Sequence, residues 1–131
     1  MKIPLKCLSS GTVSNGSIVN FVIRYDGSAI GICGFPPMDA KKGEYGFYYQ
    51  LCRKHWGEGL GYEAANGLLN YIVNNTQTQV IFADAVSINP ASLSILSRIG
   101  FQKTHIQPSE FNRNNLVLDL VHFKYEVIRT I

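Results

Sequence analysis

The sequence predicts an α/β fold in which a mixed, mostly antiparallel central sheet is flanked by helices. Several short segments rich in β-branched and aromatic residues are typical of strands. Two segments repeat their apolar residues at helical spacing. The predicted order along the chain is β-β-β-α-β-α-β-β. At 131 residues, we expect one domain spanning 1–131, with no internal repeat or linker.

The first three strands are expected before any helix. Residues 18–25 and 29–35 are typical of strands, and Asp26-Gly27 between them indicates a hairpin turn. A turn at 36–43 then leads into an aromatic strand at 44–52. In that strand alternate residues share a face, so one face is expected to carry Tyr45, Phe47, Tyr49 and Leu51.

Helices and further strands alternate in the second half of the chain. A helix follows residue 61, with apolar positions Ala64, Ala65, Leu68, Leu69 and Ile72, and 79–86 reads as a buried strand. Asn89 as N-cap, Pro90 as first residue and Gly100 past the end predict a second helix. We expect strands at 101–106 and 116–128 and a loop at 107–115.

The composition excludes several classes of protein. A net charge of +3 without a concentrated basic stripe argues against a nucleic-acid partner. The apolar runs are too short for a membrane span, and the amino terminus lacks the apolar region of a signal peptide. Three cysteines, with no metal-ligand spacing, predict reduced thiols, a cytoplasmic location and no metal.

Three glycines crowd into HWGEGLG, residues 55–61, ahead of the first helix. A glycine-rich turn before a helix is a common phosphate site, because the first amides of the helix are unpaired. The P-loop is excluded since no lysine follows, and a Rossmann turn would need glycine where Tyr62 stands, although Asp84 imitates its ribose-binding acid. The pattern [RQ]-x-x-G-x-[GA] of acyl-CoA loops fits Gly59 and Gly61, with Trp56 at its first position. A turn without a ligand stays an alternative.

A second segment, INPASLSILSRIGF at 88–101, accompanies this loop. Together with HWGEGLGYEAANGLL it resembles the GNAT superfamily of N-acetyltransferases, most of all the branch that acetylates ribosomal-protein amino termini. The residues that match are Trp56, Gly57, Gly59, Gly61, Glu63 and Ala64 in the first motif, and Asn89, Ser92, Gly100 and Phe101 in the second.

The resemblance implies an acyl-CoA acyltransferase fold whose middle strands splay apart to admit acetyl-CoA. The backbone amides of the loop and helix start would then hold the pyrophosphate, over Trp56, Gly57, Glu58, Gly59, Leu60, Gly61 and Tyr62. Leu51 and Arg53 would pair with the pantetheine arm, and Asn89 and Ser92 would contact it from the second helix. Asn89 is equally well explained as a helix cap, and the cluster Arg53-Lys54-His55 as a solvated surface.

The resemblance also implies catalytic roles. The backbone N–H of Leu51 would stabilise the oxyanion, and Ser92 would protonate the leaving thiolate, because Leu96 stands where many relatives have a tyrosine. Glu44 is the first candidate for the base and His122 the second, although a solvated glutamate and a structural histidine explain them too. Cys52 lacks the partners of an acyl-carrying nucleophile.

The implied function is acetyl-CoA-dependent transfer of an acetyl group to a primary amine, at a peptide amino terminus or on a small molecule. A non-catalytic CoA-binding or interaction module is the alternative, and a nucleotide-dependent oxidoreductase a third. The segment before Ile18 is too short for the amino-terminal helices that form the family's acceptor site. We therefore expect an open acceptor cleft, or one covered by a second copy in a homodimer.

Overall fold

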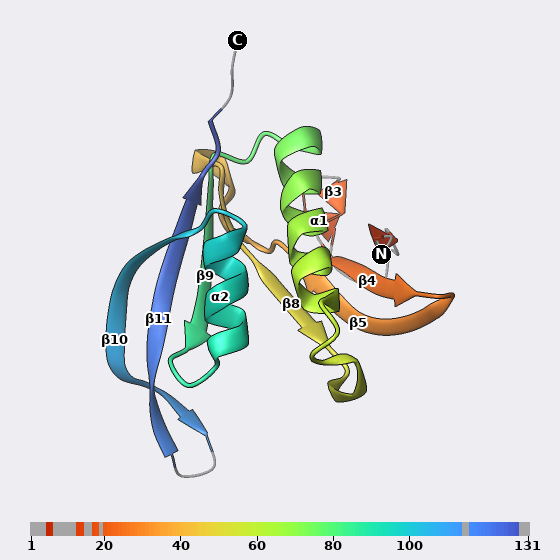
Figure 1. Cartoon of the computed structure of the whole chain (residues 1–131). Helices are drawn as coiled ribbons and strands as arrows, with labels where there is room; N and C mark the ends of the chain where they lie inside the picture. The colour runs from red at the N-terminus through yellow and green to blue at the C-terminus, as the bar shows by residue number, and fades with distance from the viewer. Residues whose placement is uncertain (1–4, 7–12, 15–16, 19, 114–115, 129–131) are drawn as a thin grey trace.

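The strands form two main sheets that diverge from each other (Figure 1). The computed structural model describes residues 5–6, 13–14, 17–18, 20–113 and 116–128. One sheet has the order β1-β4-β5-β8 and the other β10-β11-β9-β7-β6. A further two-stranded pair joins β2 (Val13–Ser14) to β3 (Ser17–Ile18). The splayed, mostly antiparallel sheet expected from the sequence is thereby confirmed.

The first sheet is antiparallel throughout. It contains β1 (Leu5–Lys6), β4 (Asn20–Tyr25), β5 (Ser28–Gly34) and β8 (Tyr48–Leu51). Asp26 and Gly27 both have positive φ, at 53° and 80°, and join β4 to β5 directly. Positive φ at both central residues is the geometry of a type I′ hairpin turn, so the hairpin expected there is confirmed.

The second sheet contains β6 (Pro37–Asp39), β7 (Glu44–Gly46), β9 (Val80–Val86), β10 (Gln102–Arg113) and β11 (Leu116–Glu126). Its β7 runs parallel to β9, with Tyr45 opposite Ile81, and the other pairings are antiparallel. A 3-10 turn, η1 (Ala40–Lys42), separates β6 from β7.

The prediction of a single strand at 44–52 is wrong in one respect, because the chain leaves one sheet and enters the other at Phe47. β7 ends at Gly46 and pairs with β9, whereas β8 begins at Tyr48 and pairs with β5. Phe47 is buried against Phe101, with ring centroids 5.1 Å apart. Alternation of polar and apolar residues gives no sign of such a change of partner, because both strands keep the same period.

Two further expectations need correction. The loop expected at 107–115 is mostly strand, since β10 continues to Arg113 opposite β11 with a register shift between Gln107 and Phe111. Such an irregularity lets a strand accommodate Pro108, which has no amide to donate. The strand expected to be buried, β9, is buried on one face only: Ile81, Ala83 and Ala85 are buried, whereas Asp84 is exposed.

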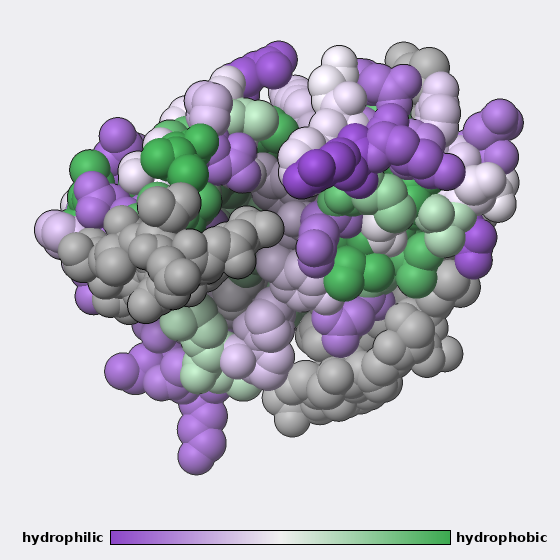
Figure 2. All heavy atoms as spheres, turned by 90° about the horizontal axis from the view of Figure 1, so that it is seen from below, coloured by the Kyte–Doolittle hydropathy of each residue, from purple (hydrophilic) through white to green (hydrophobic). Residues whose placement is uncertain are grey.

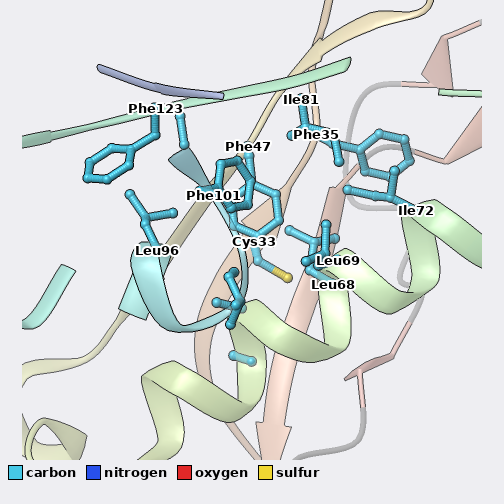
Figure 3. Close-up of a cluster of buried hydrophobic side chains, with 14 of the residues drawn as sticks. Cys33, Phe35, Phe47, Leu68, Leu69, Ile72, Ile81, Leu96, Phe101 and Phe123 are labelled. Carbon is cyan, nitrogen blue, oxygen red and sulfur yellow. The ribbon is translucent and has the colours of Figure 1, made fainter. Parts of the chain in front are cut away.

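Both helices form as expected and lie on the same side of the sheets (Figure 1). They are α1 (Leu60–Asn75) and α2 (Pro90–Arg98). α1 buries all of its expected apolar positions and packs on β5 and β8, while α2 packs on β9 and β10. The core between the helices and the sheets is aromatic and aliphatic, and it includes Phe35, Phe47, Leu68, Leu96, Phe101 and Phe123 (Figure 3).

The expected lack of amino-terminal helices concerns residues 1–17, most of which lie outside the described residues. Of the helices that the structure describes, none is long and apolar enough to cross a membrane.

Candidate functional site

A cleft of about 470 Å³ opens where β8 ends. β8 and β9 diverge toward this end of the molecule (Figure 1). Seen from that end, hydrophilic and hydrophobic residues are interspersed over the surface (Figure 2). One wall is β8, and the opposite wall is α2 with its N-cap. The loop with 3-10 turn η2 (Arg53–His55) and the start of α1 close the end.

The open edge of β8 faces this cleft. Hydrogen-bonded and non-hydrogen-bonded pairs alternate along an antiparallel ladder. The N–H of Cys52 donates to the carbonyl of Ile30 at 2.8 Å, and the register places Leu51 opposite Gly31. Leu51 therefore belongs to a non-hydrogen-bonded pair, and its N–H and carbonyl point away from β5. Since β8 is the last strand of its sheet, they point to the open edge.

Trp56 forms a hydrogen bond with one of the two backbone groups that Leu51 presents on the open edge of β8. Its indole Nε1–H donates to the carbonyl of Leu51 at 3.0 Å, and the guanidinium of Arg53 lies 5.3 Å from the centre of its ring. The indole thereby ties the loop to the end of β8. The N–H of Leu51 is left on the open edge, where it is available to a ligand.

The three glycines of the loop differ in backbone conformation. Gly57 and Gly59 have φ of 80° and 78°, a conformation that L side chains rarely adopt, and a Cβ at either would meet nothing within 4 Å. Gly61 lies where α1 meets α2 and β8, and a Cβ there would make ordinary van der Waals contacts, 3.4 Å from Cδ1 of Ile95 and 3.8 Å from Cδ1 of Leu51. Packing within the chain therefore does not require glycine at this position.

Backbone amides at the start of α1 are open to a ligand. Gly59 is the N-cap and, having no side chain, caps none of them. The unpaired first-turn amides of a helix carry the positive end of its dipole, which favours an anion. Gly57, Gly59 and Gly61 all line the cleft, so this positive end belongs to the cleft wall.

The α2 wall begins with Asn89, whose Oδ1 accepts a hydrogen bond from the N–H of Ser92 at 3.2 Å. The expected helix cap is confirmed. Asn89 and Ser92 both line the cleft opposite β8. Tyr49, which shares the face of Leu51 on β8, reaches toward Ser92 from the other side and has a buried hydroxyl.

The charge of the described lining is positive. Arg98 is the one permanently charged side chain in it, and its guanidinium lies 4.2 Å from the centre of the Tyr62 ring. Among the described residues, no carboxylate is part of the lining. His55 also lines the cleft, and its Nδ1 lies 3.5 Å from a carboxylate oxygen of Glu58, which would pair with a protonated imidazole. An anionic ligand fits this lining better than a cation.

The family follows from comparison with known proteins. The family described as "Acetyltransferase (GNAT) domain" matches residues 6–102. The chain belongs to this acetyltransferase family.

Individual relatives agree with the GNAT family assignment. A Bacillus licheniformis protein described as "Uncharacterized N-acetyltransferase p20" is 31% identical over 84 residues, which are 64% of this chain and 47% of that protein. The chain thus spans about half the length of the curated relative that it matches.

Two solved structures of similar fold are a dodecameric spermidine N-acetyltransferase from Vibrio cholerae and a ribosomal-protein-S5-alanine acetyltransferase from Vibrio fischeri. The first has a TM-score of 0.76 at 18% identity and the second 0.74 at 18%. Each alignment covers 82% of this chain, with 63% of the first structure and 61% of the second. At this identity the similarity shows the fold alone.

Most of the residues expected to bind acetyl-CoA in this GNAT domain lie together. Those that line the cleft are Leu51, Trp56, Gly57, Gly59, Gly61, Tyr62, Asn89 and Ser92. Arg53, Glu58 and Leu60 do not line it. Arg53 stacks on Trp56, Glu58 faces His55, and the Leu60 side chain is buried in the core, so Leu60 has only backbone to offer.

The two candidate bases lie outside the cleft. Glu44 begins β7, where it pairs with Asp39 of β6 and Val80 of β9. His122 on β11 stacks on His105, with ring centroids 4.5 Å apart. Among the described residues, no group of three or more His, Cys, Asp and Glu side chains is placed to hold a metal.

Leu96 is buried in the core. Tyr49 and Arg98 are among the residues of the cleft lining that sequence reasoning missed. Strand alternation already placed Tyr49 on the face of Leu51, and helical spacing places Arg98 one turn beyond Ser94 and Ile95, which also line the cleft. Strand alternation and helical spacing therefore indicated which residues share a face. Nothing in the sequence shows that these faces of β8 and α2 form the walls of one cleft.

Proposed function

We propose that this GNAT domain is an acetyl-CoA-dependent N-acetyltransferase in which an amine attacks the thioester directly. The acceptor would be a primary amine, at a peptide amino terminus or on a small molecule. The observation that carries the proposal is a single cleft in which the open backbone edge of β8, at Leu51, lies beside the uncapped amino-terminal end of α1.

The cleft suits both chemical parts of acetyl-CoA. The extended pantetheine arm carries amide groups that can pair with an open strand edge, as an added strand would. The diphosphate is anionic and suits the amides at the start of α1, where the left-handed Gly57 and Gly59 turn the chain without side chains. Arg98 adds a full positive charge to the same lining.

The reaction needs few groups from the protein. The N–H of Leu51, on the open edge, would donate to the oxygen of the thioester carbonyl as negative charge develops there. The hydroxyl of Ser92 would protonate the departing thiolate. The amine would lose its proton to water, because Glu44 and His122 do not line the cleft.

Turnover is tested by the release of free thiol from acetyl-CoA in the presence of small primary amines and of peptides with different amino-terminal residues. We expect thiol release that depends on both acetyl-CoA and one class of amine, with mass spectrometry showing one added acetyl group on that amine. No release across the whole panel would contradict the proposal.

A non-catalytic CoA-binding module is the second candidate, and Leu96 supports it. This leucine stands in the core where the family resemblance implies that many relatives carry a tyrosine. Calorimetric titration with CoA separates the candidates: binding without turnover supports the module, and no binding contradicts both.

We also propose a cytoplasmic location and a homodimer for this protein. Cys33 and Cys52 are both free, in keeping with the reducing cytoplasm predicted from the cysteine count. A second copy covering the acceptor side, as in a homodimer, is the arrangement we expect if the cleft is closed. Sedimentation analysis with and without acetyl-CoA tests it.

A further inference from the structure

The hydroxyl of Tyr49 is buried and makes no hydrogen bond within the part of the chain that the structure describes. A buried hydroxyl without a partner is costly, so its place in a structure calls for an explanation. Packing explains the ring, which lies edge-on to Phe47 with centroids 6.3 Å apart. Packing does not explain the oxygen, since phenylalanine would fill the same space.

The polar side chain that acts on this hydroxyl is Ser92. It acts on the Tyr49 hydroxyl closely enough to lower its pKa, although burial is the larger effect and raises the pKa overall. The phenol therefore stays protonated at neutral pH. The Tyr49 hydroxyl has no hydrogen-bond partner in this structure, so the Ser92 side chain must rotate for the two hydroxyls to join.

The two side chains approach each other from the opposite walls of the cleft. Tyr49 lies two residues before Leu51 on the same face of β8, and its ring is fixed between the core and the cleft. Ser92 lies in the first turn of α2, where Asn89 fixes its backbone but leaves its side chain free to turn. A sulfur atom held near the N–H of Leu51 would lie close to this pair.

We propose that Tyr49 is a positioning residue whose hydroxyl donates to Oγ of Ser92 and directs the Ser92 O–H at the leaving sulfur. The inference rests on the proposed transferase function. As the amine nitrogen bonds to the carbonyl carbon, the C–S bond breaks and its electron pair goes to sulfur. Sulfur takes the proton of Ser92, Ser92 takes the proton of Tyr49, and the proton released by the amine to water restores the phenol.

The test compares kcat, KM for acetyl-CoA and melting temperature in the full chain for Tyr49→Phe, Ser92→Ala and the double variant. We expect kcat to fall about 100-fold in Ser92→Ala and about tenfold in Tyr49→Phe, because positioned proton donors contribute on that order. The double variant should lose no more than Ser92→Ala alone, since the phenol acts only through the serine. KM should change less than about twofold, and Ser92→Thr should retain most of kcat.

Tyr48→Phe is the matched control. Tyr48 is the next residue of the same strand but on the opposite face, where its hydroxyl donates to Oδ1 of Asn20 at 2.7 Å. Removal of the Tyr48 hydroxyl should leave kcat unchanged.

Full kcat in Tyr49→Phe, or losses that multiply in the double variant, would overturn the inference while leaving the transferase proposal intact. A fall of kcat matched by a fall in melting temperature in Tyr49→Phe would show a packing role only. No turnover by the wild-type chain with any amine would overturn both proposals.

Discussion

Arg98 gives the described cleft lining its positive charge, and the Tyr62 ring holds the guanidinium in place. The guanidinium lies over the tyrosine ring, so its position is fixed without a carboxylate that would cancel its charge. The carboxylate of the loop, Glu58, faces His55 and lies outside the lining. The full positive charge of the described lining thus comes from α2, through Arg98.

Removing this charge should weaken the binding of CoA. We expect Arg98→Gln to raise the Kd for CoA about tenfold, the scale of one charge-assisted hydrogen bond, with a smaller effect at high salt. Calorimetry with CoA measures it. Lys41→Gln, the same change of charge on the exposed turn η1, is the control and should leave the Kd unchanged. Equal effects of the two variants would mean that Arg98 acts only through net charge.

The two described cysteines should differ sharply in reactivity. Burial raises the pKa of Cys33 from its ordinary value of 9.0 to about 12, whereas Cys52 is exposed at the end of β8. In a Cys7→Ser background at pH 8, a thiol reagent should modify Cys52 within minutes and Cys33 only as the chain unfolds. Peptide mapping after labelling measures both, and rapid labelling of Cys33 in the folded chain would contradict its burial.

The same shift predicts a dependence of stability on pH. Cys33 keeps its proton in the folded chain above pH 9, where the unfolded chain loses it, so the free energy of unfolding should fall as the pH rises from about 9 toward 12. Cys33→Ala should show a shallower fall over that range in denaturant titrations. If the free energy of unfolding of Cys33→Ala fell with pH as steeply as that of the wild type, the raised pKa of Cys33 would be contradicted.

At the scale of the element, α2 is held at its start by Asn89 and carries one wall of the cleft. The cap bond to the N–H of Ser92 and Pro90 in the first turn both favour a helix that begins here. Both were visible in the sequence because capping is local. Contact of Asn89 with a ligand is a separate role, and the two roles can be separated by substitution.

Asn89→Ala should lower the free energy of unfolding by about 1 kcal/mol, through loss of the cap. Asn89→Asp keeps the accepting oxygen and should preserve stability, but its carboxylate would repel an anionic ligand and raise the Kd for CoA. Thermal unfolding and calorimetry measure the two effects. Wild-type affinity in Asn89→Asp would show that Asn89 is only a cap.

At the scale of the whole molecule, the cleft exists because β8 and β9 belong to different sheets. The sequence predicted the hairpin at Asp26-Gly27, both helices and the glycine loop, since turns, caps and helical spacing depend on neighbouring residues. It did not predict the change of sheet at Phe47 or the continuation of β10 past Gln107. Those depend on which distant strand supplies the hydrogen bonds, and strand period alone does not reveal the partner.

The site, too, could be predicted only in part, because some of its residues come together through contacts between distant segments. The motif residues around Trp56 and Asn89 could be predicted to lie together because the family resemblance supplied their arrangement. Tyr49 and Arg98 could not, because their approach to the cleft depends on how far β8 diverges from β9 and on the packing of α2 over the gap.

The central claim is that the backbone amides from Gly57 to Tyr62 bind the diphosphate of an acyl carrier while the open edge of β8 receives its pantetheine arm. The most direct test follows backbone amide chemical shifts by NMR during titration with CoA and, separately, with pantetheine. We expect CoA to shift the amides of Leu51 and of 57–62, and pantetheine to shift Leu51 but leave 57–62 unchanged. Binding of CoA that leaves the 57–62 amides unchanged would contradict the account.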